Sequence, residues 1–456
     1  MTQQPSTSST SSNNGAPSAN RIIDDCFRRD PLDQTRLSHG EAVAALKARI
    51  APIAARGHVR LGDACGRILA QDVRATLSVP GHTNSAVDGY AFAFSDYDIS
   101  SVQTGDPPHG ELIGHTFPIA GRATAGHGPA GIIAPGAAVR IFTGAVVPDG
   151  LDTVAMQEDC ALSPDGHVII PDGLRGGANV RCAGEDVAQG DVLVQAGERL
   201  RPQDIAALAS SGGADVSCFK PIRVGIASTG DEVVVADGTR DISSGQVFDV
   251  NSPMLAGFIR QTGASVVDLG IWPDRRDETE QRLLDAAQSC DVVLTTGGAS
   301  QGEEDHIAHG LAARGNRHFW QIAVKPGRPL MFGQVGNTIV VGMPGNPVAV
   351  FVCFLLYVYP LIGRLGGANW FEPRRFPLPA AFSIDDRKLG RREFLRGISV
   401  QTPNGLVVEK FPRDGSGLIS GLRAADGLIE IPEDRPSVVA GELVDFIPFS
   451  QFGVVE

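Results

Sequence analysis

Four apolar segments that run into glycine-rich turns constrain the fold of this chain more than any other feature. They are PIRVGIASTGDE at 221–232, ASVVDLGIW at 264–272, CDVVLTTGG at 290–298 and NTIVVGMPGNP at 337–347. Segments with helical spacing lie between them, around 254–262, 278–288 and 307–314. The alternation predicts an α/β domain at 221–367 with a doubly wound parallel sheet, whose ligand site is expected at the carboxyl ends of the strands.

The sequence on either side of this domain predicts mostly β structure. Helical spacing occurs at 37–50 and after Pro202, but residues from 57 to about 197 are short apolar runs broken by glycine and proline. After residue 367, five strand-like segments predict a small β domain. We therefore expect a disordered tail at 1–36, an N-terminal region with a helical linker part and a β-rich domain at 37–220, the α/β domain at 221–367 and the C-terminal β domain at 368–456.

Charge and cysteine content narrow the classes of function. The chain of 456 residues carries 39 Lys and Arg residues against 52 Asp and Glu residues, and this net charge of −13 argues against nucleic acid as the main partner. Its seven cysteines contain no CxxC pair, which fits a reducing compartment. Its first 20 residues lack the apolar core of a signal peptide, so a cytoplasmic protein is expected.

One apolar run, at 348–362, raises the question of a membrane span. It is 15 residues long, whereas a helix that crosses a bilayer needs roughly 20. It follows Asn346-Pro347, a helix cap with proline at the first helical position. A buried helix without membrane association is therefore the interpretation.

The turn STGDE at 228–232 follows the first predicted strand of the α/β domain. Backbone N–H groups of Ser228, Thr229 and Gly230 can bind an anion there, while the two acids at 231–232 can hold Mg²⁺. A solvated turn explains the same residues, so this turn alone does not establish a site.

The turn TTGGASQGEED at 295–305 follows a second predicted strand. Gly297 and Gly298 allow the backbone to approach a ligand closely, and Ser300 offers a hydroxyl. Its three acids, which end at Asp305, either favour the dipole of the following helix or face a cation that offsets their mutual repulsion.

The segments KPGRP and MPGNP supply the complementary charge. Lys325 and Arg328 are the cations that a tetrahedral oxyanion would need. Pro344, Asn346 and Pro347 form a rigid turn onto a helix N-terminus, where backbone N–H groups attract anions. The sequence contains no GxxxxGK[ST] motif, which excludes a P-loop.

A further segment, HTNSAVDGYAF at 82–92, lies in the β-rich N-terminal region. It lacks the alternation of a strand although it carries several polar side chains, among them Asp88, which indicates a loop with a functional role. The alternative is a plain hairpin turn at Asp88-Gly89.

In chain order, these segments resemble the motifs of the MoeA proteins and of the E domain of gephyrin. NSAVDGYA resembles the family's NSAMDGYA, and RIFTGA and RCAGEDV resemble RIMTGA and RRRGEDI. STGDE, GGASQGEED, KPGRP and MPGNPV complete the set, so the resemblance runs from about 37 to about 449. Each motif is weak alone, but seven collinear matches are highly specific.

The resemblance implies an elongated homodimer of four-domain subunits with the active site at the subunit interface, and an α/β domain like that of the MogA-type molybdopterin adenylyltransferases. It implies a molybdopterin molybdenumtransferase, which inserts molybdenum from molybdate into adenylylated molybdopterin and releases AMP with a divalent cation, Mg²⁺, in the final step of molybdenum cofactor biosynthesis. Molybdopterin adenylyltransferase, molybdoenzymes and their chaperones are the partners that this implies.

The resemblance also implies the roles of individual residues. It assigns the catalytic and Mg²⁺-binding roles to four carboxylates, which are Asp88, Glu232, Asp274 and Asp305. It assigns substrate binding to the turns above and to positions in both halves of the chain, which are Thr143, Asp186, Ser228, Thr229, Gly230, Gly297, Gly298, Ser300, Lys325, Arg328, Pro344, Asn346, Pro347, Arg396 and Ser416.

Three departures from the family pattern concern molybdate binding, since Gln321 and Thr83 stand where lysine and an acid are common, and Ala349 replaces a common serine. Two other functions stay open at this point. A nucleotide pyrophosphatase or amidase could use the same α/β domain, but it would not need NSAVDGYA. A non-catalytic scaffold would not need the carboxylates.

Overall fold

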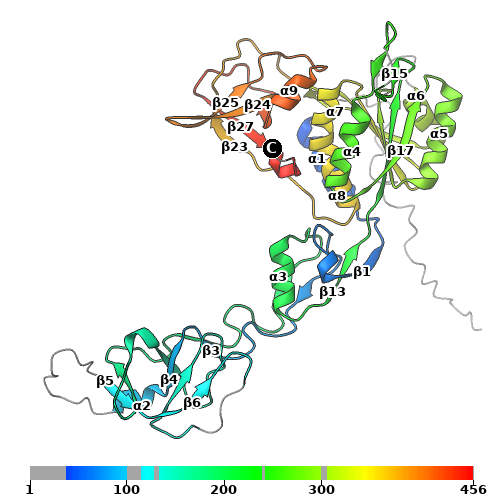
Figure 1. Cartoon of the computed structure of the whole chain (residues 1–456). Helices are drawn as coiled ribbons and strands as arrows, with labels where there is room; N and C mark the ends of the chain where they lie inside the picture. The colour runs from blue at the N-terminus through cyan, green and yellow to red at the C-terminus, as the bar shows by residue number, and fades with distance from the viewer. Residues whose placement is uncertain (1–36, 100–113, 128–132, 239–241, 299–305, 455–456) are drawn as a thin grey trace, which may run out of the picture.

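The molecule is elongated and has three bodies in a row (Figure 1). The computed structural model describes residues 37–99, 114–127, 133–238, 242–298 and 306–454, with the backbone only at 98–99 and 316–320. The α/β and C-terminal domains pack together at one end, a β-rich body lies at the other end, and a smaller body joins them.

The α/β domain is built on a six-stranded sheet with the order β17-β14-β18-β22-β21-β19. The strands are β14 (Arg223–Thr229), β17 (Ser265–Trp272), β18 (Val292–Thr296), β19 (Asn316–Gln321), β21 (Pro329–Val335) and β22 (Thr338–Met343). Strands β17, β14, β18 and β22 are parallel, which confirms the predicted sheet. The sequence did not predict the last two strands of this sheet, β21, which is antiparallel to β22, and the edge strand β19, which is antiparallel to β21.

Helices cover both faces of this sheet, as a doubly wound fold requires. They are α4 (Asn251–Gln261), α5 (Arg276–Ser289), α6 (His306–Arg314), α7 (Pro347–Cys353), the π-helical turn η4 (Phe354–Val358) and α8 (Tyr359–Leu365). Helices α4, α7 and α8 share one apolar core with the sheet, and α5 and α6 share the other. Among the described residues one helix, Pro347–Leu365, is apolar and long enough to cross a membrane, but 83% of it is buried in the protein, as expected for a core helix.

The C-terminal domain is a β-sheet that recruits a strand from the α/β domain. Its sheet has the order β20-β24-β26-β27-β23, with β25 paired to β24. The elements are β20 (Val324–Lys325), β23 (Phe376–Pro379), β24 (Arg392–Thr402), β25 (Gly405–Lys410), α9 (Ile419–Ala424), β26 (Gly427–Ile431), β27 (Leu443–Pro448) and the 3₁₀ turn η5 (Phe449–Phe452). Strand β20, within KPGRP, pairs parallel with β24, so the two domains share a sheet.

Helix α1 (His39–Arg49) begins at a capping box formed by Ser38 and Glu41. The sequence prediction grouped it with the N-terminal region. Its apolar residues Ala42 and Leu46 pack into the core shared by the α/β and C-terminal domains. The apolar stripe of a short helix indicates that the helix is covered, but not which domain covers it.

The joining body consists of two strand pairs and a helix. Strand β1 pairs with β13, and β2 pairs with β12, while α3 packs on them. The elements are β1 (Arg56–Arg60), η2 (Leu61–Asp63), β2 (Val73–Arg74), β12 (Val192–Val194), α3 (Pro202–Ser210) and β13 (Asp215–Phe219).

The β-rich body at the far end contains a four-stranded sheet β6-β7-β4-β8, a three-stranded sheet β5-β10-β9 and the pair β3-β11. The elements are β3 (Asn84–Ser85), β4 (Gly89–Phe92), α2 (Phe94–Ile99), β5 (Gly114–Phe117), β6 (Ile119–Ala123), β7 (Ala138–Ile141), β8 (Thr153–Met156), η3 (Gln157–Asp159), β9 (Ala161–Leu162), β10 (Val168–Pro171) and β11 (Val180–Arg181). A remaining pair of short strands, β15 (Val233–Val234) and β16 (Val247–Phe248), projects from the α/β domain.

Candidate functional site

The turns after β14 and β18 touch each other at the carboxyl edge of the parallel strands. A Cβ atom at Gly297 would lie 2.5 Å from the Oγ1 atom of Thr229, and one at Gly298 would lie 2.9 Å from Ile307. Both glycines have positive φ angles, 92° and 64°, which other residues rarely adopt. Glycine is therefore required for the two predicted ligand turns to meet.

The hydroxyl of Ser228 lies in a buried polar cluster below these turns. Its Oγ atom donates to Asp249 at 2.7 Å and lies 2.9 Å from the hydroxyl of Ser252 and 3.1 Å from that of Thr296. Ser228 is only 2% exposed, so its side chain shapes the turn from inside. Asp249 also accepts from the backbone N–H groups of Asn251 and Ser252, and so caps the first turn of α4.

Replacing Asp249 with alanine is expected to lower the free energy of unfolding by about 2 kcal/mol, because a helix cap and a hydrogen bond to a buried hydroxyl are lost together. Chemical denaturation would measure the loss. The matched control is Asp285→Ala on α5, an exposed aspartate that accepts from the side-chain amide of Gln281. It should change stability by less than about 0.5 kcal/mol. An equal loss of stability in the two variants would contradict the role of Asp249 as a helix cap.

The carboxylates at this edge lie on neighbouring loops. The backbone N–H of Asp231 donates to Asp274 at 3.3 Å, and the N–H of Asp274 donates to Asp231 at 3.2 Å. The carboxylate of Glu232 folds back against Gly230, where a Cβ atom would lie 2.5 Å from its Oε2 atom. Asp305 and Ser300 lie outside the described residues.

Mg²⁺ prefers oxygen ligands, and in proteins it is commonly held by one or two carboxylates together with substrate phosphates. Glu232 and Asp274 fit that donor set. Within the described part of the chain, no group of three or more His, Cys, Asp or Glu side chains could enclose a metal ion.

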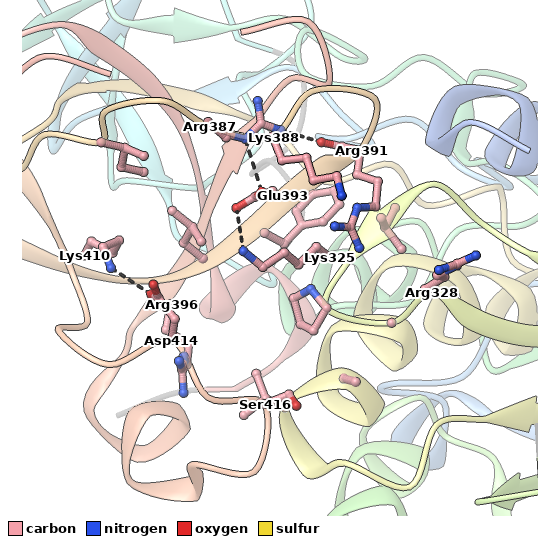
Figure 2. Close-up of a pocket in the computed structure, with 18 of the residues that line it drawn as sticks. Lys325, Arg328, Arg387, Lys388, Arg391, Glu393, Arg396, Lys410, Asp414 and Ser416 are labelled. Carbon is pink, nitrogen blue, oxygen red and sulfur yellow. Dashed lines mark hydrogen bonds and ion pairs between the residues drawn. The ribbon is translucent and has the colours of Figure 1, made fainter. Parts of the chain in front are cut away.

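A basic pocket lies between the α/β domain and the C-terminal domain (Figure 2). Its volume is about 680 Å³, which suits a small-molecule ligand. Seven lysine and arginine side chains line it, which are Lys325, Arg328, Arg387, Lys388, Arg391, Arg396 and Lys410. Four carboxylates line it as well, which are Asp385, Asp386, Glu393 and Asp414. The pocket therefore carries net positive charge in a chain whose overall charge is −13.

The predicted oxyanion residues come together in this pocket. Lys325 and Arg328 line it together with Pro344 and Asn346, whereas Pro347 begins the adjacent helix α7. The MPGNP turn is fixed on both sides. The side-chain amide of Asn251 donates to Gly345 at 2.8 Å, and the N–H of Val348 donates to the carbonyl of Ser416 at 3.0 Å.

Arg396 and Ser416 bring the C-terminal domain into the same pocket. Arg396 is 6% exposed and donates to the carbonyls of Leu418 and Arg413, and its guanidinium lies 5.0 Å from the ring centre of Phe411. Burial lowers the pKa of Arg396. Arg396 thus holds the loop that carries Ser416 against the pocket.

Asp88 and Thr143 form a second centre, in the β-rich body. The carboxylate of Asp88 accepts from the backbone N–H of Thr143 at 2.8 Å and from its hydroxyl at 2.7 Å. These bonds, helped by the charge of Arg140, lower the pKa of Asp88. The hairpin alternative is wrong, because β3 pairs with β11 while β4 pairs with β7 and β8.

Asp186 lies on the loop after β11 in the same body. Its backbone N–H donates to the carbonyl of Val79 at 3.1 Å, and that of Ala183 donates to the Thr83 hydroxyl at 3.3 Å. This loop therefore runs beside the segment that leads into Asp88. The β-rich body and the α/β domain lie at opposite ends of the molecule, so one chain does not bring Asp88 to Glu232 (Figure 1).

Three regions of the chain match described protein families. Residues 37–212 match the MoeA N-terminal region (domain I and II), residues 225–364 match a probable molybdopterin binding domain, and residues 380–449 match the MoeA C-terminal region (domain IV). A molybdopterin molybdenumtransferase of Haemophilus influenzae is 36% identical over 395 residues, 86% of this chain and 94% of that protein. The chain belongs to the MoeA family.

Other MoeA relatives agree with this assignment. Molybdopterin molybdenumtransferase 2 of Mycobacterium tuberculosis is 32% identical over 88% of this chain and 96% of its own length. The crystal structure of the molybdopterin biosynthesis MoeA protein from Pyrococcus horikoshii is 29% identical and covers 91% of this chain and 100% of its own, with a TM-score of 0.75. The predicted family and fold class are both confirmed.

The basic pocket of this MoeA protein contains residues that sequence reasoning missed. Arg387, Lys388 and Arg391 lie in the connection between β23 and β24, and Lys410 ends β25. The signal was the run DDRKLGRREF, whose basic residues precede a strand at close spacing. Such runs are usually solvated, and only the packing of two domains turns this one into a pocket wall.

Proposed function

We propose that this MoeA protein is a molybdopterin molybdenumtransferase, which inserts molybdenum from molybdate into adenylylated molybdopterin and releases AMP. The observation that carries the proposal is the basic pocket beside the MPGNP turn, in an acidic chain that is homologous to molybdenumtransferases over most of its length. An adenylyltransferase makes adenylylated molybdopterin, the substrate of this reaction, and molybdoenzymes use the molybdenum cofactor that it releases. The adenylyltransferase and the molybdoenzymes are therefore candidate partners.

Charge explains why such a reaction needs this architecture. Molybdate, the dithiolene sulfurs and the pyrophosphate are all anionic, so they repel one another unless cations lie between them. In the proposed arrangement, Lys325, Arg328 and Arg396 hold molybdate. The backbone turns at Gly298 and Asn346 bind the remaining oxyanions through N–H groups. The buried Oδ1 atom of Asn251, which has no hydrogen-bond partner among the described residues, is an acceptor left for the pterin beside this turn.

The proposed Mg²⁺ ligands are Glu232 and Asp274, with Asp305 from the segment outside the described residues. The cation would supply charge neutralisation at the pyrophosphate. Asp88 and Thr143 would complete the cleft from a second copy of the chain. The separation of the two bodies in Figure 1 supports this, because a single chain leaves Asp88 far from the α/β domain. A homodimer is therefore part of the proposal.

The test is to incubate the purified full chain with adenylylated molybdopterin, Mg²⁺ and molybdate and to assay AMP and molybdenum cofactor. Release of both products that depends on molybdate is the expected result. AMP release without any molybdate dependence would indicate a nucleotide pyrophosphatase, and the absence of both products would overturn the proposal.

Lys325→Ala is expected to raise the molybdate concentration for half-maximal AMP release by about tenfold, because one charged hydrogen bond to the oxyanion is lost. Its effect on the half-saturating pterin concentration should be smaller. The matched control is Lys47→Ala, whose ion pair with Glu372 is exposed on both sides and contributes little. An unchanged molybdate requirement in Lys325→Ala would place the oxyanion elsewhere.

A further inference from the structure

The cations of the basic pocket differ in whether the protein already neutralises them. The Nζ atom of Lys325 lies 3.4 Å from the carboxylate of Glu393, which is also 3.4 Å from the guanidinium of Arg387. Lys410 pairs with Asp414 at 2.8 Å. An anion that approaches Lys325 or Lys410 therefore competes with an internal carboxylate.

Lys388 and Arg391 have no such counter-ion. Within the part of the chain that the structure describes, neither side chain forms an ion pair or donates a hydrogen bond. Lys388 is exposed and Arg391 is half-buried. In Figure 2 both side chains extend from the β23–β24 connection toward the side of the pocket that carries Arg328. Arg328 donates a long hydrogen bond of 3.4 Å to the side chain of Gln321.

The backbone that carries these two residues is held firmly. The buried side chain of Arg387 donates to the carbonyls of Pro432 and Arg435 and to that of Arg391 itself. The N–H of Arg387 donates to Pro436 at 2.8 Å, and the N–H of Gly390 donates to Glu433 at 2.9 Å. Lys388 and Arg391 are thus presented from an anchored connection, which reduces the entropic cost of binding a ligand there.

We propose that Lys388 and Arg391 are further oxyanion-binding residues of this chain, which capture the doubly charged tetrahedral oxyanion at the mouth of the basic pocket that also contains Lys325 and Arg328. This rests on the proposed function and names residues that set its molybdate affinity. A cation without an internal partner binds an external anion without first breaking an ion pair.

Equilibrium dialysis of the full chain against molybdate, with metal analysis of both compartments, measures the binding directly. Lys388→Ala and Arg391→Ala are each expected to raise the dissociation constant of molybdate about tenfold, and the double variant about a hundredfold. Arg391→Lys, which keeps the charge but not the planar fork, should lose less. The control is Arg374→Ala, an exposed arginine of the same domain outside the pocket, whose backbone contacts to Gln451 do not need its side chain.

Steady-state AMP release separates capture from chemistry. Both alanine variants should raise the half-saturating molybdate concentration while the rate at saturating molybdate stays within about twofold. Competition with phosphate and sulfate identifies which oxyanion the site binds. Strong displacement of molybdate by an equal concentration of phosphate would indicate a phosphate subsite and overturn the assignment to molybdate.

Dissociation constants within twofold of wild type in both alanine variants would overturn the proposal, as would a wild-type chain that binds no molybdate. The failure of the proposed function is a different result. In that case wild-type protein binds molybdate through Lys388 and Arg391, but it releases no AMP from adenylylated molybdopterin.

Discussion

Asp88→Asn is expected to lower the rate of AMP release by about a hundredfold, a typical loss when a charged group at a reacting centre is removed. The asparagine keeps an oxygen that accepts the two hydrogen bonds from Thr143, so the loop should keep its shape. Only the negative charge is lost. Quenched-flow or steady-state measurement of AMP at saturating molybdate checks the rate, and thermal unfolding checks that the β-rich body is intact.

The control for this variant is Asp149→Asn, an exposed aspartate in the same body, which should leave the rate unchanged. Mixed dimers test the shared cleft. When Asp88→Asn and Glu232→Gln chains are combined, half of the dimers carry one intact and one doubly substituted cleft, so about one quarter of wild-type activity should return. Full activity in Asp88→Asn would refute its role, and no recovery in the mixture would refute a cleft built from two chains.

Gly327→Ala is expected to destabilise the protein by about 3 kcal/mol and to disrupt the basic pocket. Gly327 lies in the middle of KPGRP at φ 107°, and a Cβ atom there would lie 2.4 Å from the Sγ atom of Cys353. Cys353 is fully buried in α7, so it cannot move aside easily. Chemical denaturation and molybdate dialysis would measure the two effects.

Gly405→Ala separates backbone strain from the clash. Gly405 has a similar φ angle of 116°, but a Cβ atom there would meet nothing within 4 Å. Gly405→Ala should therefore lower the free energy of unfolding by only about 1 kcal/mol. Adding Cys353→Ala to Gly327→Ala should recover part of the difference, because the clashing sulfur is gone. Equal losses in Gly327→Ala and Gly405→Ala, with no recovery in the double variant, would contradict the close-approach explanation.

Strong local patterns made much of the fold predictable. The strands of the parallel sheet and the five strands of the C-terminal domain occur where apolar segments end in turns, since both period and turn chemistry are local properties. The last two strands of the six-stranded sheet, β21 and β19, were missed. A signal for β21 existed, because Gly336-Asn337 is a two-residue turn between apolar runs, a typical hairpin pattern. Strand β20 had no such signal, as its two residues are extended only because β24 lies beside them.

In the candidate site, too, the sequence predicted local features but not the contacts between distant segments. The motif STGDE predicts a tight turn, and Gly297 and Gly298 predict a close approach, but the partner of that approach, Thr229, follows only from strand order. The sequence assigned the backbone N–H of Ser228 to an anion and did not predict where its hydroxyl lies, which the structure places among Asp249, Ser252 and Thr296. These residues are distant in sequence or belong to a segment that no motif marked.

By itself, the sequence determined the kind of chemistry: glycine turns, carboxylates and cations in a collinear order that is specific to the MoeA family. Tertiary structure alone decided which of these groups meet. One pocket is lined by Lys325, Arg391 and Ser416, because β20 joins the sheet of another domain. Asp88 lies at the opposite end of the molecule. The physical reason is that turn and strand preferences act over a few residues, whereas the charge at a site is the sum over groups that only packing brings within a few ångströms of one another.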